Sequence, residues 1–403
     1  AATAPGRGVR RGQPGCRPYY PTLGAFIKES LTVLQLLPAL EGGGVERGTL
    51  DVAAELVRRG HRSLVMSARG RLLPELIASG SEHISCPLGH KSPTSLRYVW
   101  QLRRLLTTAG IDIVHARSRL PAWLAWLAWR SLDASTRPRF MTTVHGLYSV
   151  NRYSAVMMKG ERIVAVSGVV RGYILENYSG VDPARIQVIP RGVDTTLFRK
   201  DYLPRDAWQA DWYRRYPQLL DRFVITLPGR VGARKGVFEF IQVIARLRQD
   251  GHDVHGLVVG ERARHDRKLA RRMDAAITAA GVSDAITCTG FREDVREILA
   301  VSNAVVSMSR KPEAYGRTVN EALSLGIPVA GYDHGGVAEQ LAAHFPAGRV
   351  PLGNLDDMVG RLAAWIERPP RMDDVQPHTL ELMLDSTLQL YRELADSTRR
   401  IPA

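Results

Sequence analysis

The stretch Lys311-Pro-Glu-Ala-Tyr-Gly-Arg-Thr-Val-Asn-Glu-Ala-Leu-Ser-Leu-Gly-Ile-Pro-Val329 predicts a turn, a short helix and a strand in succession. Gly316 permits an unusual backbone turn, and the apolar residues that follow it recur at helical spacing. Gly326 stands where a helix ends, and a strand is expected over residues 327–330.

Two acids in this stretch, Glu313 and Glu321, are separated by seven residues. On this assignment Glu313 lies in the loop and Glu321 on the helix. The free N–H groups at the helix start suit an anion, and they belong to Tyr315, Gly316, Arg317 and Thr318. Because carboxylates accept hydrogen bonds from hydroxyls while N–H groups bind phosphate oxygens, the combination fits a nucleotide sugar. The alternative is that Glu313 only caps a turn and Glu321 faces solvent.

Strand and helix units with short connections recur along the chain. One series starts with a strand at residues 31–37, and a second starts with a strand at residues 223–227. Such alternation predicts an α/β fold of two parallel-sheet domains, which bind ligands where the strands end, in the cleft between them. A helix at residues 379–396 is expected to cross back to the first domain. The length of 403 residues, with 45% hydrophobic and 24% charged residues, fits two soluble domains.

The net charge of +15 is compatible with nucleic acid, an anionic membrane surface or acidic substrates as partners. Seven of the 55 basic residues are lysines, which leaves 48 arginines scattered along the whole chain. A general arginine bias therefore explains the charge as well as a binding patch does. The apolar stretch at residues 120–129 is about half the length needed to cross a bilayer. Its three tryptophans recur every third residue, which favours a helix packed on its sheet.

Cysteine usage and the N-terminus bear on location. The three cysteines are odd in number and far apart, which matches neither a disulfide framework nor a zinc site and implies a reducing compartment. Residues 1–28 contain arginine, glycine and proline without the apolar core of a secretory signal, so a disordered basic arm is expected. We expect a cytoplasmic protein, with peripheral binding to the inner face of the cytoplasmic membrane as an open alternative.

Three glycines, Gly42, Gly43 and Gly44, lie between the strand at residues 31–37 and a helix at residues 45–59. Without Cβ atoms this loop can approach a ligand at a helix N-terminus, which is a phosphate-binding geometry. The loop matches neither the dinucleotide-binding glycine fingerprint nor the P-loop. The alternative is a glycine loop that merely turns the chain.

Two histidines close predicted strands, His115 and His145. A single histidine at such a place is usually a satisfied core residue. His145 is followed by Gly146 in an expected turn, which favours a position facing the cleft.

Two cations, Arg230 and Lys235, follow the strand at residues 223–227 in a glycine-rich loop that leads into a helix. An arginine can bind two phosphate oxygens and a lysine supplies a mobile point charge, so the pair suits a diphosphate. A solvated charge cluster is the alternative.

The sequence strongly resembles the retaining glycosyltransferases of family 4, which have the GT-B fold of two Rossmann-like domains. It is most similar to the bacterial lipopolysaccharide and exopolysaccharide enzymes of that family. The resemblance covers roughly residues 31–395, and its motifs occur in order along the chain: Glu41-Gly-Gly-Gly-Val-Glu46, Thr143-Val-His-Gly-Leu-Tyr148, Arg191-Gly-Val-Asp194, Gly229-Arg230 with Lys235-Gly236, Glu313 and Glu321 seven residues apart, and Gly335-Gly-Val-Ala-Glu339.

The resemblance implies a role for each motif. Arg230 and Lys235 would hold the donor diphosphate, and Glu321 would accept the ribose hydroxyls. Glu313 would touch the transferred sugar, near the amides of Tyr315, Gly316, Arg317 and Thr318. Gly43 and Gly44 would let the first domain approach the donor, and His145 would line the sugar site. The loop around Phe291 and Arg292 would receive the base.

The implied domain plan has an acceptor side and a donor side. Its parts are the arm at residues 1–28, an acceptor-side domain at 29–198, a connection at 199–221, a donor-side domain at 222–375, and a crossover helix and tail at 376–403. The family implies transfer of a hexose-type sugar from a nucleotide-diphosphate sugar to a lipid-linked or saccharide acceptor, as in cell-envelope polysaccharide and lipopolysaccharide biosynthesis. No cofactor or metal is expected, and the sequence contains no Asp-x-Asp triplet that argues for one.

Two other functions stay open on the sequence. A sugar-nucleotide 2-epimerase of the same fold requires acid and base pairs in place of an acceptor site. A basic nucleic-acid-binding protein requires a concentrated basic stripe, and the scattered arginines argue against one.

Overall fold

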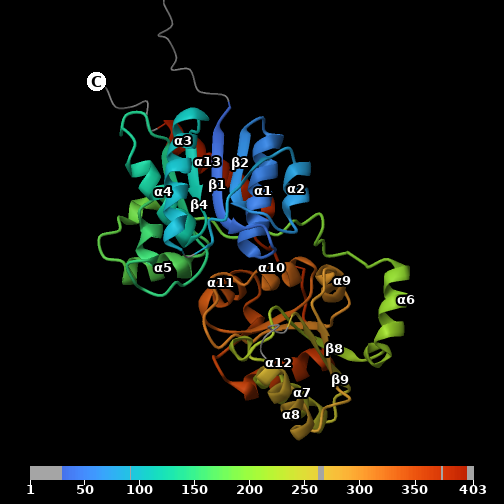
Figure 1. Cartoon of the computed structure of the whole chain (residues 1–403). Helices are drawn as coiled ribbons and strands as arrows, with labels where there is room; N and C mark the ends of the chain where they lie inside the picture. Colours follow the sequence, from blue (N-terminus) through green and yellow to red (C-terminus); the bar gives the residue numbers. More distant parts are fainter. Residues whose placement is uncertain (1–29, 91, 262–266, 374, 397–403) are drawn as a thin grey trace, which may run out of the picture.

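Two domains, each built on a parallel sheet, make up the computed structural model, which describes residues 30–90, 92–261, 267–373 and 375–396 (Figure 1). The basic arm predicted for residues 1–28 lies outside the described residues. The predicted α/β fold of two parallel-sheet domains is confirmed.

The first domain has a seven-stranded sheet in the order β3-β2-β1-β4-β5-β6-β7. Its strands are β1 (Thr32–Ala39), β2 (Arg62–Ala68), β3 (Glu82–Ser85), β4 (Ile113–Ala116), β5 (Arg139–Val144), β6 (Arg162–Ala165) and β7 (Ile186–Val188). Its α-helices are α1 (Gly44–Arg58), α2 (Leu73–Ala78), α3 (Arg97–Thr108), α4 (Arg119–Arg130) and α5 (Gly168–Asn177).

The second domain has a six-stranded sheet in the order β10-β9-β8-β11-β12-β13. Its strands are β8 (Phe223–Pro228), β9 (Val254–Val259), β10 (Ile286–Gly290), β11 (Ala304–Ser307), β12 (Val329–Tyr332) and β13 (Arg349–Val350). The helices after the first domain are α6 (Asp206–Arg215), α7 (Val237–Gln249), α8 (Arg267–Ala279), α9 (Val295–Ala300), α10 (Arg317–Ser324), α11 (Gly335–His344), α12 (Leu355–Glu367) and α13 (Leu380–Asp396).

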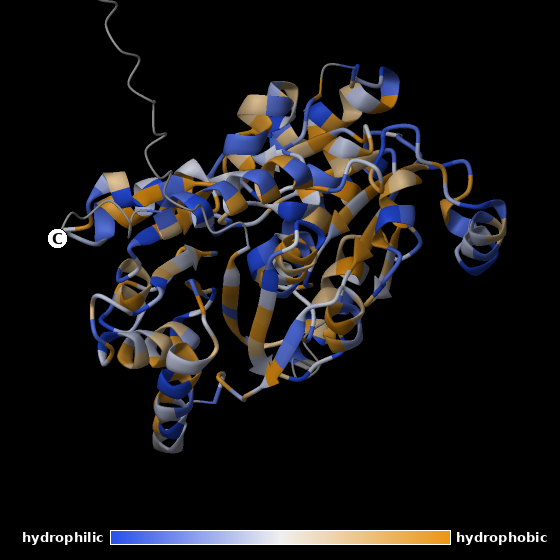
Figure 2. Cartoon of the chain, turned by 90° about the horizontal axis from the view of Figure 1, so that it is seen from above, coloured by the Kyte–Doolittle hydropathy of each residue, from blue (hydrophilic) through white to orange (hydrophobic). Residues whose placement is uncertain are grey.

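The central strands are buried on both faces, which explains their nearly unbroken apolar sequences. All six residues of β9 are buried, and so are the residues of β1 from Val33 to Leu37. Helices cover the sheets, and Figure 2 shows hydrophilic colour mainly on the helices and loops and hydrophobic colour along the strands. A strand with both faces covered has no polar side, so its sequence reads as a continuous apolar run.

The predicted connection at residues 199–221 contains helix α6, which lies beside the second domain (Figure 1). Trp212 of this helix is 3% exposed and packs in an apolar cluster with β8 and β9 residues. The Trp208 ring stacks on the Trp212 ring at 5.2 Å, and the Trp208 indole donates a hydrogen bond of 2.7 Å to Asp294. The aromatic residues of this segment therefore attach it to the second sheet.

The chain passes between the domains twice, and the two passages are hydrogen-bonded to each other. Val193 N–H donates to the His378 carbonyl at 2.9 Å, and Leu380 N–H donates to the Val193 carbonyl at 2.7 Å. The neighbouring Gly192 has no room for a side chain, because a Cβ atom there would lie 2.3 Å from the Thr379 carbonyl oxygen. Asn320 of α10 donates to the His378 carbonyl at 2.9 Å and accepts from its N–H at 3.2 Å, so α10 is fixed to the crossing.

Helix α13 crosses back and completes the core of the first domain, as the sequence predicts. Its residues Leu388, Tyr391 and Leu394 pack in one apolar cluster with Val33 and residues of α1 and the sheet. His115 of β4 is buried there, with Nδ1 2.7 Å from the Tyr391 hydroxyl and Nε2 2.6 Å from the Thr143 hydroxyl. Of the two histidines that close strands, His115 is therefore the core residue, and both of its ring nitrogens have hydrogen-bond partners.

Helix α4 carries the tryptophans of the apolar stretch. Trp129 is 7% exposed and donates a hydrogen bond of 2.6 Å to the Pro138 carbonyl, while Trp123 donates one of 2.8 Å to the Tyr153 carbonyl. Among the described helices, none combines the length and the apolar character needed to cross a bilayer.

The bond between His115 and Tyr391 gives a stability prediction. Tyr391→Phe keeps the ring but leaves a buried imidazole nitrogen unpaired, which should lower the free energy of unfolding by about 1–3 kcal/mol. Thermal or urea unfolding followed by circular dichroism measures the change. Gln389→Ala, on the exposed face of the same helix, should change it by less than about 0.5 kcal/mol. Equal effects of the two substitutions would contradict the role of this bond.

Candidate active site

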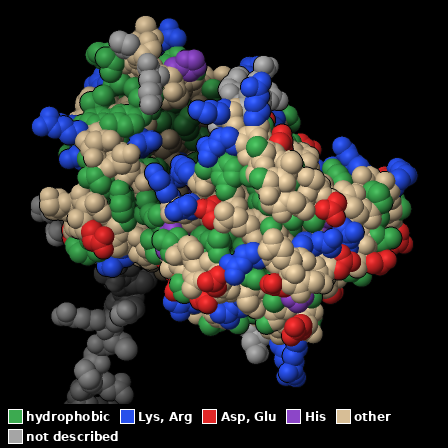
Figure 3. Space-filling view, turned by 90° about the horizontal axis from the view of Figure 1, so that it is seen from below, with side chains coloured by type: hydrophobic (Ala, Val, Ile, Leu, Met, Phe, Trp, Pro, Cys, Tyr) green, Lys and Arg blue, Asp and Glu red, His purple; other side chains and the backbone are tan. Residues whose placement is uncertain are grey.

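A cavity of about 950 Å³ lies between the domains and is lined by residues of both. Four of the residues singled out in the sequence line it: His145, Arg230, Lys235 and Glu313. They come from the ends of β5, β8 and β11, which is where parallel sheets bind ligands. Figure 3 shows Lys and Arg side chains gathered beside a hollow on this face of the molecule.

Glu313 and Lys235 form an ion pair at the wall of the cavity. The Lys235 ammonium donates to the Glu313 carboxylate at 2.6 Å, and the Ser309 hydroxyl donates to the same oxygen. Burial opposes ionisation of the Glu313 carboxyl, but these two partners bring its pKa below the ordinary value of 4.5. Glu313 is therefore an ionised acceptor of hydrogen bonds at neutral pH.

Helix α10 begins beside this pair, as the sequence predicts. Gly316 precedes it with φ of +89°, a left-handed conformation that glycine adopts without strain. In the described part of the chain, the N–H groups of Arg317 and Thr318 in its first turn have no hydrogen-bond acceptor. The Glu321 carboxylate pairs with the Arg317 side chain of the same helix at 2.9 Å. Burial raises the pKa of Glu321 in spite of this cation.

His145 contacts the glycine loop through one arginine. Arg191 Nη2 donates to the Gly44 carbonyl at 2.7 Å and lies 3.3 Å from His145 Nδ1. Burial, together with Arg191 and Arg117, lowers the pKa of His145 well below its ordinary value, so the imidazole is neutral. Because Nδ1 accepts from Arg191, the ring proton belongs on Nε2, which has no partner among the described residues. His145 therefore has one buried ring N–H without an acceptor among the described residues, in a residue that lines the cavity.

Further cations line the cavity that the sequence did not single out: Arg234, Lys268, Arg272 and Lys311. Lys268 and Arg272 are four residues apart on α8, so they lie on one face of that helix. This spacing predicts a basic helix face from the sequence. It does not predict that the face lines the cavity, because that depends on the position of α8 beside the loop of Arg230.

The predicted base-binding loop divides into two parts. Phe291 is 49% exposed, and the Arg71 guanidinium of the first domain lies 4.9 Å from its ring centroid. Arg292 instead turns to the α6 side, where it donates to Asp294 and lies over the Trp212 ring. A base-stacking role stays a prediction for Phe291, and Arg292 is already held by a carboxylate.

The domains also touch through a carboxylate that caps a helix across the interface. Glu339 of α11 accepts hydrogen bonds from Gly168 N–H at 2.8 Å and Val169 N–H at 2.9 Å, at the first turn of α5. Beside it the Ser167 hydroxyl donates to the Ala314 carbonyl at 2.6 Å. A carboxylate at a helix N-terminus is stabilised by the free N–H groups and the helix dipole. These contacts hold the loop of Glu313 against the first domain.

Comparisons with known proteins agree with this architecture. Residues 42–197 match the sequence family described as Glycosyltransferase Family 4, and residues 211–379 match the family described as Glycosyl transferases group 1. The crystal structure of a glycosyltransferase from Rickettsia africae superposes with a TM-score of 0.81 and 29% identity, over 91% of this chain and 98% of that one. Alr3699/HepE from Anabaena, in complex with UDP and glucose, superposes with a TM-score of 0.76 and 17% identity, over 90% of this chain and 100% of that one.

The 2-deoxystreptamine glucosyltransferase of Streptomyces kanamyceticus is 31% identical over 50% of this chain and 46% of its own length. The matched region thus spans about half of that curated relative. By its two domains and its fold, the chain belongs to the GT-B glycosyltransferases.

The ion pair in the cavity predicts a pH-dependent effect on stability. Lys235→Met leaves the buried Glu313 carboxylate without its cation, so its pKa should rise above the ordinary value. The folded variant then binds a proton more readily than the unfolded chain. Its melting temperature should fall by a few degrees relative to wild type at pH 7.5, a change of about 1 kcal/mol, and by less at pH 4.5.

The matched control is the double variant Lys235→Met/Glu313→Gln, which removes both charges. Its melting temperature should lie above that of Lys235→Met at pH 7.5 and should not share the recovery at acid pH. An equal loss for Lys235→Met at both pH values would show that Glu313 is not responsible.

Proposed function

We propose that the protein transfers a sugar from a nucleotide-diphosphate sugar to an acceptor hydroxyl, with retention of the anomeric configuration and without a metal ion. One observation supports this most: Arg230, Lys235, Glu313 and His145 meet in a single cavity between the domains, although they come from three distant parts of the chain. The cations of Arg230 and Lys235, which suit a diphosphate, then lie beside the Glu313 carboxylate and the His145 imidazole, which suit a sugar.

The donor lies along the second domain in this proposal. Arg230, Lys235 and the free N–H groups at the start of α10 bind the diphosphate, and Glu321 receives the ribose hydroxyls. The complex of Alr3699/HepE with UDP and glucose supports a donor of this kind for the fold. The base reaches toward Phe291, whose ring is exposed.

Chemistry in this arrangement depends on charge stabilisation. The bond between the anomeric carbon and the diphosphate oxygen breaks, and the negative charge that develops on the phosphate is stabilised by Arg230 and Lys235. The acceptor hydroxyl attacks from the face that the diphosphate leaves, and its proton passes to the departing phosphate oxygen. Glu313 therefore orients the sugar rather than forming a bond to it, so the glycosidase rule for paired carboxylates does not apply. Contact between the domains excludes water, which would hydrolyse the donor.

The acceptor in this proposal is lipid-linked or a saccharide, in cell-envelope polysaccharide or lipopolysaccharide biosynthesis. The relative named for 2-deoxystreptamine makes a free small molecule the second candidate. These acceptors differ in whether transfer requires membrane material.

A donor panel tests the proposal. Purified protein is incubated with UDP-, GDP- and ADP-sugars, with and without a membrane extract, and nucleoside diphosphate release is measured. One donor should stand out, and Arg230→Ala should lower kcat with that donor by about 10²-fold, because a charge-stabilising group is lost. Glu321→Gln should raise the donor KM.

Arg205→Gln, an exposed position at the start of α6, is the control and should leave the rates unchanged. If no nucleotide sugar binds, or if Arg230→Ala and Glu321→Gln behave like Arg205→Gln, the transferase proposal fails. Interconversion of the donor sugar without release of nucleoside diphosphate would indicate the epimerase instead, and salt-sensitive duplex binding would indicate the nucleic-acid-binding protein.

A further inference from the structure

Two arginines of the first domain, Arg117 and Arg191, lie together behind the sugar end of the cleft without a carboxylate of their own. Arg117 is 3% exposed, donates to Gln35 Oε1 at 2.6 Å, and leaves its Nε without a partner. Among the described residues, Arg191 bonds only to Gly44 and His145. Within the described residues, neither guanidinium forms an ion pair with an acid.

Charges around this pair are mostly positive. Asp51 of α1 is an acid whose charge acts on both arginines, and it experiences the fields of four arginines: Arg191, Arg47, Arg317 and Arg117. Arg47 and Arg317 already have the partners Glu75 and Glu321, so Asp51 alone faces Arg117 and Arg191. Burial raises the pKa of Asp51 to about 6, and burial and Arg117 lower the pKa of Arg191 to about 9. Both pKa shifts arise because Asp51 and Arg191 are removed from water and have too few opposite charges nearby to compensate.

Arg191 still has free donors next to His145, which lines the cavity between the domains. A guanidinium has five N–H groups, and the Gly44 carbonyl and His145 engage only Nη2. Within the described residues Nε and Nη1 have no hydrogen-bond partner, and the Arg191 side chain is partly exposed. Nη1 lies against Gly48 of α1, where a Cβ atom would stand 2.1 Å from it. The absence of a side chain at Gly48 leaves space for Arg191.

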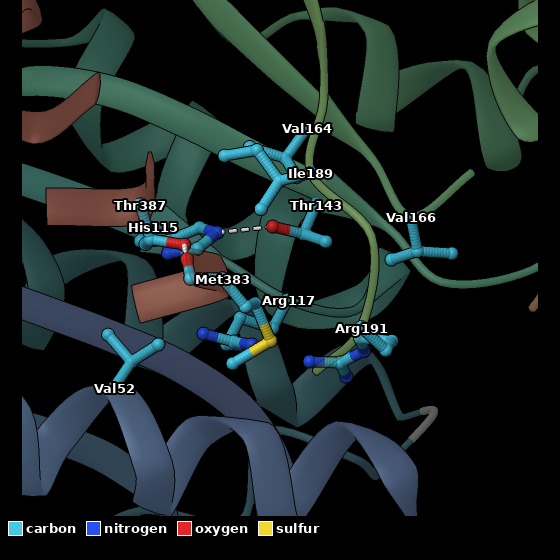
Figure 4. Close-up of a pocket in the computed structure, with 10 residues that line it drawn as sticks. All are labelled: Val52, His115, Arg117, Thr143, Val164, Val166, Ile189, Arg191, Met383 and Thr387. Carbon is cyan, nitrogen blue, oxygen red and sulfur yellow. Dashed lines mark hydrogen bonds between the residues drawn. The ribbon is translucent and has the colours of Figure 1, made fainter. Parts of the chain in front are cut away.

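The small cavity behind the pair shows on which side a ligand fits. It has about 20 Å³ and is lined by Arg117 and Arg191 together with His115, Thr143, Met383 and Thr387 (Figure 4). That volume holds about one water molecule and excludes a phosphate. An anion can therefore reach Arg191 only at its partly exposed surface beside Gly44 and His145, and His145 lines the cavity between the domains, while Arg117 supports Arg191 from behind as a positioning residue.

We propose that the acceptor carries a negatively charged group, a phosphate or a carboxylate, which binds to the free donors of Arg191. This inference rests on the proposed transferase function, which places the diphosphate at Arg230 and Lys235 in the other domain. Arg191 lies instead in the first domain, next to the imidazole expected at the sugar. An anion at Arg191 is therefore a second negative group, separated from the diphosphate by the transferred sugar.

Inorganic phosphate is the probe that tests this site. Melting temperatures are measured in saturating nucleoside diphosphate, which occupies the donor cations, while phosphate replaces chloride at constant ionic strength. Phosphate stabilises proteins generally by exclusion from their surface, so the informative quantity is the difference between variants. Wild type and Arg205→Gln should gain at least about 1 °C more than Arg191→Gln at 50 mM phosphate, roughly what a millimolar Kd gives. Arg191→Lys should retain part of the gain.

Each outcome has a definite meaning. An equal phosphate shift in wild type and Arg191→Gln would overturn the proposal. If Arg191→Gln still gains stability from nucleoside diphosphate but gains less from phosphate than wild type does, both the fold and the donor site are intact and the site is supported. If no nucleoside diphosphate binds at all, the transferase function fails, while the phosphate titration still reports on Arg191. Binding of UDP-glucuronic acid and of UDP-glucose is also compared. If UDP-glucuronic acid binds more tightly and the difference disappears in Arg191→Gln, the anion belongs to the donor sugar and the assignment to the acceptor is overturned.

Discussion

The arrangement of the two sheets depends on the crossing of two chain segments at Gly192, Val193 and His378. Each domain could in principle turn about these connections, but the two segments are hydrogen-bonded to each other and to Asn320. Asn320 lies on α10, next to Glu321, so the helix that starts beside Glu313 is oriented by the same contacts. The start of α10 and the interdomain crossing are thus joined by hydrogen bonds, so the position of α10 relative to the first domain is fixed by the crossing.

Across the cleft, the opposing surfaces are held by polar groups rather than by a large apolar contact. Glu339 caps α5, Ser167 binds the Ala314 carbonyl, and Arg71 lies over Phe291. Polar interfaces between domains are weaker than apolar cores, and each of these bonds can exchange with water. The exception is Tyr315, which is 6% exposed and packs into the apolar core of the first domain. A change of the cleft width has to withdraw this one aromatic side chain from its pocket.

Local sequence patterns predicted the architecture well because parallel sheets have strict rules. Apolar runs followed by glycine and a helical period identify strand ends, and strand ends of one sheet meet at one edge, which is how His145, Arg230, Lys235 and Glu313 could be expected in one cleft. The contacts of Arg191, Glu339 and Tyr391 were missed for a physical reason. They join residues 147, 171 and 276 positions apart, and their partners are a carbonyl, two amides and a core histidine that no pattern distinguishes. For Arg292 the sequence position was predicted but not the side-chain orientation. Its contacts with Asp294 and Trp212 turn the side chain toward α6.

The docking of α13 on the first sheet has a consequence for how the chain is made. Leu388, Tyr391 and Leu394 fill a core that also contains residues of β1, the first strand of the described chain. Until the last turns of α13 are synthesised, the part of that face that α1 does not cover stays open, and His115 has no hydroxyl at Nδ1. The second domain, which lacks this dependence, can fold earlier. The core of the first domain is therefore completed only after the whole second domain has been synthesised, and a chain that stops before residue 380 leaves part of that apolar face uncovered.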